Sequence, residues 1–242
     1  MNQPEKRSII RPSHRMAELV YENPALLLLM ENLEIDFLLH EYTVSHICQT
    51  SGINEKLFIM LGNLYNGHLP PEEELHAILP SELLPVVDFL KRCHNYYKEE
   101  QYPAIKALIG ELNLRNRRPE IRMVEQFFND YFEEVLEHLD YEDEVAFPYL
   151  RSLLEGSVSG MQQSRFSVQE YRDHHTDIET KLSDLKALLL QHIEVEDDRR
   201  IRRRLLMQLA ELEADLVIHS LIEEQILIPF VEKLEKGGAH EK

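Results

Sequence analysis

The chain has 242 residues, of which 43% are hydrophobic and 29% are charged, a balance typical of a folded globular protein rather than a disordered one. Its formal net charge of -18 at pH 7 disfavours a general role on nucleic acids or anionic membranes, since both repel an acidic surface. Because no apolar run could cross a bilayer and the N-terminus lacks an apolar signal core, we expect a cytoplasmic protein without nucleic-acid or membrane partners. Few glycines, no tryptophan and long Leu/Glu/Lys/Arg-rich runs predict an all-α fold.

Residues 1–66 predict a small helical N-terminal domain. One helix ends at the Asn23-Pro24 pair, and the stretch "TVSHICQTSGINEKLF" predicts a helix, a glycine-containing turn and a second helix capped by Asn54. The same stretch could be a helix-turn-helix. The domain carries 5 Lys+Arg against 8 Asp+Glu, however, and this disfavours a DNA reader.

A linker rich in proline and acidic residues follows at 67–80, and a short tail occupies 237–242. Between them, residues 81–236 contain four long helical segments separated by short breaks, which predict an up-down-up-down four-helix bundle. The last segment begins in "DDRRIRRRLL", where we expect Asp197 or Asp198 to cap a solvated helix rather than a nucleic-acid patch. The predicted segments are 81–113, 119–155, 165–194 and 198–236.

Two of the six His-x3-Glu patterns in the chain belong to a longer repeat. The stretches "EHLDYEDEVAFPYL" and "IHSLIEEQILIPFV" align without gaps at an offset of 81 residues. The alignment matches His138 with His219, Glu142 with Glu223, and Pro148 with Pro229. Histidine and glutamate four residues apart lie on one helix face, where both can reach the same metal centre.

The same offset relates His94 on the first bundle helix to His175 on the third, and each precedes the next repeat histidine by 44 positions. At about 1.5 Å per residue, the four histidines lie at one level of an antiparallel bundle. The sequence therefore describes two similar hairpins. The alternative to metal binding is that each histidine and glutamate are buried residues that simply hydrogen-bond to each other. That would explain one His-x3-Glu pattern, but not two patterns in the same register. The predicted metal ligands are His94, His138, Glu142, His175, His219 and Glu223.

Four imidazoles and two carboxylates suit a pair of transition-metal ions bridged by the carboxylates. The absence of thiolate favours iron or manganese over structural zinc. Six protein ligands leave coordination positions for water, O2, NO or a bridging oxo group. Pro148 and Pro229 lie more than one turn beyond the glutamates, where we expect them to bend the helices without disturbing the ligands.

These residues, with the [FI]-P-[YF] motif that follows, resemble the hemerythrin-like (HHE cation-binding) family over about residues 81–236. Within that family the four-histidine, two-glutamate set is most similar to the di-iron iron-sulfur cluster repair proteins. The resemblance implies two Fe ions in an oxo- and carboxylate-bridged centre, with manganese or a mixed pair as alternatives. It also implies a role in nitrosative or oxidative stress, with O2 or NO as ligands and iron-sulfur proteins as partners.

The chain departs from the repair proteins at two places. Their N-terminal domain carries an adjacent Cys-Cys-Gly-Gly after an Asp-Phe pair, whereas this chain has Leu38, Leu39, His40 and Glu41 there. His174 stands where they have an acidic residue. Glu134 does match a family carboxylate suggested to line the approach to the metals, and its alternative is a solvated helix residue.

Two metal-dependent functions remain open from the sequence, and a plain four-helix structural protein is a third alternative that stoichiometric binding of two metals would exclude. One is repair of damaged iron-sulfur clusters, or handling of NO or O2 in that context, and whether this is enzymatic is not decided. The other is a di-iron gas, redox or iron sensor, or an iron-binding protein, that signals through the N-terminal domain, whose helices are also a candidate homodimer surface. Beyond the ligands, Cys93 is expected to be a buried thiol, and one of Tyr96, Tyr97, Tyr131 and Tyr141 could contact the ligands.

Overall fold

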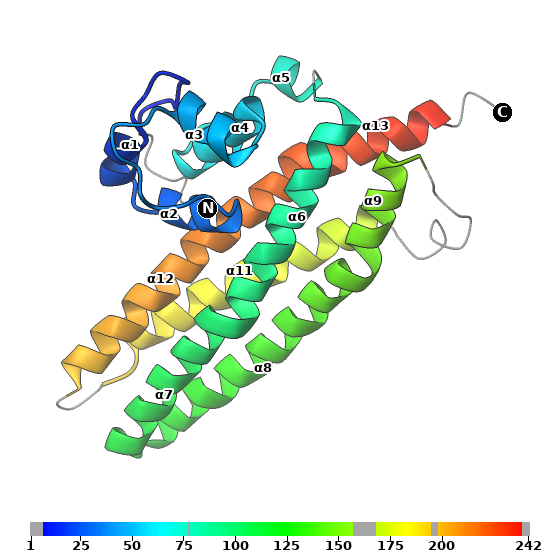
Figure 1. The fold of residues 1–242 in the computed structure, drawn as a ribbon. Helices are drawn as coiled ribbons and strands as arrows, with labels where there is room; N and C mark the ends of the chain where they lie inside the picture. Colours follow the sequence, from blue (N-terminus) through cyan, green and yellow to red (C-terminus); the bar gives the residue numbers. More distant parts are fainter. Residues whose placement is uncertain (1–6, 77, 157–167, 195–197, 239–242) are drawn as a thin grey trace. The chain divides into compact units, whose positions relative to one another are not determined.

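The computed structural model describes residues 7–76, 78–156, 168–194 and 198–238 (Figure 1). Throughout these ranges the secondary structure is helical, apart from turns and one isolated bridge between Arg15 and Thr43, which confirms the all-α prediction. In the same ranges, no helix combines the length and apolar character that crossing a bilayer requires. The helices are α1 (Met16–Glu22), α2 (Leu26–Asn32), α3 (Val44–Ser51), α4 (Glu55–Tyr65), α5 (Glu72–His76), α6 (Pro80–Tyr96), α7 (Tyr102–Asn116), α8 (Pro119–Tyr141), α9 (Phe147–Leu154), α11 (Val168–Gln191), α12 (Arg199–Ile222) and α13 (Ile228–Gly238).

The chain divides into two compact units, which we describe separately. The first unit comprises Met1–Arg92 with Leu221–Lys233, and the second comprises Cys93–Ser220 with Leu234–Lys242. The division into domains predicted from the sequence, with boundaries at residues 66, 80 and 236, stays a prediction.

In the first unit, local signals set the ends of the short helices. The side chain of Asn54 accepts hydrogen bonds from the backbone amides of Lys56 and Leu57, as expected of the N-cap of α4. Gly52 ends α3 with a φ of 69°, a left-handed conformation that glycine adopts without strain. The predicted order of a helix, a glycine-containing turn and a second helix over this stretch is confirmed.

Close packing and buried polar contacts join the helices of this unit. A Cβ added to Gly62 of α4 would lie 2.7 Å from Ile10 Cδ1, so the glycine allows a close approach. Buried Asn23 donates to the carbonyl of Tyr65 and to the side chain of Asn66, which ties the break between α1 and α2 to the end of α4.

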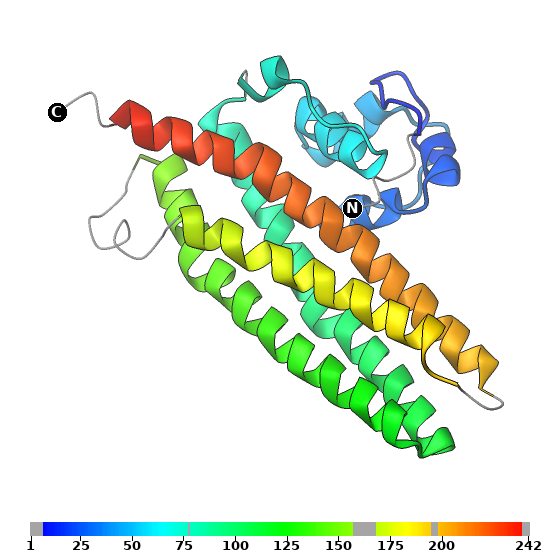
Figure 2. The same cartoon turned by 180° about the vertical axis from the view of Figure 1, so that it is seen from behind.

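The second unit is a bundle in which four helical stretches run side by side in both views (Figures 1 and 2). Its first stretch runs from Cys93 through α7, and α8 with α9 returns beside it. The third stretch is α11 and the fourth is α12 as far as Ser220, so that successive stretches run in opposite directions. The four predicted helices and their up-down-up-down order are confirmed, and each described end lies within a few residues of its prediction.

At one end of this bundle, buried Asp198 directly precedes α12 and connects it with the end of α7. The Asp198 carboxylate accepts hydrogen bonds from Asn116 Nδ2 at 2.6 Å and from Arg115 at 3.5 Å. Its backbone carbonyl accepts from Arg202 N, as the residue before a helix does. Asp198 therefore holds the N-cap position of α12, while its side chain binds Asn116 and Arg115; the other candidate, Asp197, is outside the described residues.

Three π-helical turns interrupt otherwise continuous helices, at Tyr97–Gln101, Glu142–Ala146 and Glu223–Leu227. The residue that follows each turn donates its backbone N–H to the carbonyl of the first residue of the turn, and the next residue is a proline. Proline has no N–H, and its ring would clash with a carbonyl in a regular α-helical turn. A widened turn relieves that clash and keeps the helix continuous.

Candidate metal centre

Five of the six predicted ligands have described side chains, and all five are buried, none of them more than 8% exposed. His94 comes from the end of α6, His138 from α8 and His219 from α12. Glu142 and Glu223 are each the first residue of a π turn. The prolines therefore alter helix geometry at the glutamates themselves, so the expectation of an undisturbed ligand turn was wrong.

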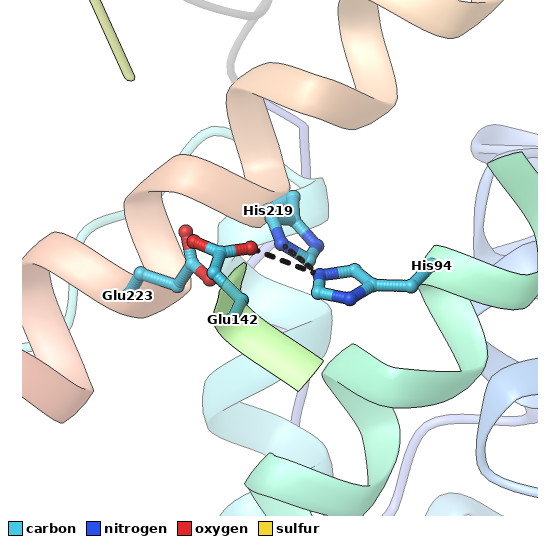
Figure 3. A group of neighbouring side chains, drawn as sticks. All are labelled: His94, Glu142, His219 and Glu223. Carbon is cyan, nitrogen blue, oxygen red and sulfur yellow. Dashed lines mark hydrogen bonds and ion pairs between the residues drawn. The ribbon is translucent and has the colours of Figure 1, made fainter. Parts of the chain in front are cut away.

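Four of these residues form a compact group of potential ligands: in His94, Glu142, His219 and Glu223, one ligand atom from each lies within 4.8 Å of the others. Figure 3 shows the four side chains turned toward one another. His94 Nε2 lies 3.2 Å from Glu142 Oε2 and 3.3 Å from His219 Nε2. Side chains separated by more than a hundred residues thus converge on one small volume.

The fifth predicted ligand, His138, contacts this group through Glu142, whose Oε1 lies 3.2 Å from His138 Nε2. The two oxygens of Glu142 therefore lie beside the ring nitrogens of two different histidines. The sixth predicted ligand, His175, lies on α11 with its neighbour His174. Both of their side chains are outside the described part of the structure.

A second carboxylate, that of Asp143, contacts the other ring nitrogen of His94. His94 Nδ1 lies 3.0 Å from Asp143 Oδ1, and Phe147 stacks on the ring with 5.1 Å between centroids. Burial alone would lower the pKa of His94, but hydrogen bonds to Asp143 and Glu142 outweigh that effect and raise the pKa to about 9. A metal ion at Nε2 would take the place of the proton on that nitrogen.

The donor set fits a transition-metal centre. Two imidazoles and two carboxylates are nitrogen and oxygen donors of the kind that first-row metals bind. Glu142 and Glu223 are both fully buried, and two neighbouring carboxylates repel each other strongly in a low-dielectric interior unless a cation or protons compensate them. A cation bound among them would remove that cost. Whether the six predicted residues are the ligands stays a prediction.

Some neighbours of the group were not singled out in the sequence. Asp143 is one, and a signal for it exists, because an acidic residue follows each repeat glutamate: Asp143 after Glu142 and Glu224 after Glu223. Tyr97, by contrast, is one of the four tyrosines considered in the sequence, and its ring centroid lies 5.7 Å from that of His219.

Other candidate residues have described contacts with residues that are not predicted ligands. Tyr96 accepts a hydrogen bond from Gln101, and the hydroxyl of Tyr131 lies 3.3 Å from that of Tyr102. Glu134 is half-exposed and forms an ion pair with Lys181. Cys93 is buried, as expected.

Comparison with known proteins agrees with this geometry. The sequence profile described as Hemerythrin HHE cation binding domain matches residues 85–231. This span exceeds half of the chain and contains all six predicted ligands. No curated protein matches the chain. The chain therefore belongs to the hemerythrin HHE cation binding family and is a metal-binding protein of the hemerythrin type.

Proposed function

We propose that the chain is a non-haem di-iron protein that acts in the repair of damaged iron-sulfur clusters or in the handling of NO and O2 under nitrosative and oxidative stress. The position of Glu142 is the observation that supports two metal ions rather than one. Its Oε2 lies beside His94 and its Oε1 beside His138, each at 3.2 Å from a ring nitrogen. A carboxylate with one oxygen toward each of two imidazoles is arranged to bridge two ions.

In this proposal, His94 and His219 would hold one ion and His138 and His175 the other, and Glu142 and Glu223 would supply carboxylate ligands. The close approach of His94 Nε2 and His219 Nε2, 3.3 Å apart, supports the first pair. When bound, the ions would supply redox and ligand-binding chemistry. The chain's own residues hold the ligand geometry, and buried neighbours such as Phe147 and Tyr97 limit the access of water.

Metal analysis of protein purified from iron-supplied cells, together with its optical spectrum, tests this proposal. We expect two irons per chain and near-ultraviolet charge-transfer absorption. The double variant His138→Ala/Glu223→Ala should lose both. His192→Ala is a matched control, because His192 begins another His-x3-Glu pattern but is exposed. One ion or none in the unmodified protein would overturn the di-iron proposal.

A second candidate function is a di-iron sensor, or an iron-binding protein, that signals through its N-terminal domain. Leu38, Leu39, His40 and Glu41 replace the thiol pair of the repair proteins, and Leu38 is 67% exposed in the loop between α2 and α3. This loop therefore lacks the thiols that redox transfer would use. Repair predicts that the reduced, iron-loaded protein reactivates an oxidised aconitase-type cluster. Sensing predicts no reactivation, but altered partner binding after oxidation or exposure to NO.

A further inference from the structure

Lys98 contacts Asp143, and Asp143 contacts the ring of His94. Lys98 Nζ lies 2.8 Å from Asp143 Oδ2, and Asp143 Oδ1 lies 3.0 Å from His94 Nδ1. Lys98 also contacts Asp140 Oδ1 at 2.8 Å. The side chains of Lys98 and Asp143 are about three-quarters buried, with 21% and 25% of their surfaces exposed.

The contact with Asp143 decides which nitrogen of His94 can bind a metal. Asp143 is an acceptor, so Nδ1 must carry the proton that is shared with it. The lone pair of a neutral imidazole is then on Nε2, the atom that lies 3.2 Å from Glu142 and 3.3 Å from His219. The hydrogen bond also fixes the rotation of the ring.

Lys98 has a corresponding effect on Asp143. Its ammonium group contacts the second carboxylate oxygen and so favours the ionised form, which accepts a hydrogen bond but does not donate one. The residues come from different helices: Lys98 lies in the π turn after α6, and Asp143 in the π turn after α8. The contacts thus join the two helices beside the proposed ligands.

We propose that Asp143 is a positioning residue that sets the tautomer and orientation of His94 for metal binding, and that Lys98 holds Asp143 in place. The inference rests on the proposed metal-binding role of His94. Partners of this kind usually contribute about 10- to 100-fold to metal affinity. Neither residue is expected to bind the ion.

Cobalt(II) titration of the full chain tests the inference, with affinity measured from the visible absorption of the bound ion. We expect Asp143→Ala to bind cobalt about 10- to 100-fold more weakly and to release it faster to a chelator. Asp140→Ala is the matched control, because Asp140 contacts Lys98 but not His94 in the described contacts, and its affinity should equal that of the unmodified protein. Equal affinities for Asp143→Ala and Asp140→Ala would overturn the inference.

A spectroscopic measurement separates positioning from general loss of structure. The Nδ1 proton of a cobalt-bound His94 should give an exchangeable, paramagnetically shifted proton resonance, which Asp143→Ala should shift or broaden by faster exchange. If Asp143→Ala does not fold, Asp143→Asn serves instead, because its carbonyl can accept the same bond without the charge. An intermediate affinity and an altered resonance are then expected, and an unchanged resonance would overturn the inference. Failure of the unmodified protein to bind cobalt would instead overturn the proposed metal-binding role.

Discussion

Tyr97 donates a hydrogen bond from its hydroxyl to Asp215 Oδ2, and both residues are buried in the bundle. Asp215 lies one helical turn before His219 on α12, and the Tyr97 ring meets the His219 ring edge-on. Tyr97 therefore contacts the turn that carries a proposed ligand, both through its ring and through its hydroxyl.

We expect Tyr97→Phe to lower the free energy of unfolding by about 1–3 kcal/mol, because the buried carboxyl group of Asp215 loses the hydroxyl that donates to it. Urea unfolding followed by circular dichroism measures the change. Tyr21→Phe is the control, because the Tyr21 side chain is 86% exposed and its hydroxyl should contribute nothing measurable. Equal stability of the two variants would contradict the prediction.

Removal of metal should destabilise the protein, since the folded state alone assembles the buried group. A metal present at about 100 times its dissociation constant adds about 2.7 kcal/mol of stability by mass action. The midpoint of thermal unfolding should therefore fall when a chelator is added. In His138→Ala/Glu223→Ala the chelator should have no effect, and a persistent effect would place the metal elsewhere.

Stability should decrease in alkaline solution partly because of Cys48. Burial is the main cause that raises the pKa of its thiol from the ordinary 9 to about 11. Between these values the unfolded chain releases the thiol proton more readily than the folded one, so stability falls as pH rises from 9 to 11. Urea unfolding across this window should show a steeper fall for the unmodified protein than for Cys48→Ala. If the stabilities of the unmodified protein and of Cys48→Ala fall in parallel across this window, the prediction is wrong.

Glu134→Gln should change the free energy of unfolding by less than about 1 kcal/mol and leave the metal content unchanged. The reason is that Glu134 is half-exposed and pairs with Lys181, and exposed ion pairs contribute little. Urea unfolding and metal analysis check both parts, with exposed Glu133→Gln as the neighbouring control. Loss of metal in the Glu134 variant alone would show a role at the centre.

The helices could be predicted from the sequence because it has few glycines, no tryptophan and long Leu/Glu/Lys/Arg-rich runs separated by short breaks. The internal repeat was as informative for the site. It aligned His138 with His219 and Glu142 with Glu223, and the structure brings the side chains of these four residues close to His94 or to one another.

Two features could not be predicted in this way. The contact between Asp143 and His94 depends on the rotation of one helix relative to another, which the pattern within each helix does not determine. A π turn forms where a backbone amide bonds to the carbonyl five residues before it rather than four, and the residue pattern does not determine this choice. The prolines indicated a local disturbance, but not that it begins at Glu142 and Glu223.

The π turn at Glu142–Ala146 also constrains which changes of length the chain can tolerate. A π turn contains one residue more than the α-helical turn that it replaces, so deleting one residue after Glu142 would let this turn close to regular α-helical geometry. Phe147 and Leu150, now buried, would keep their direction, but the ring of Pro148 would then meet a carbonyl of a regular turn. A one-residue deletion between Glu142 and Pro148 should therefore be tolerated only when Pro148 is replaced as well.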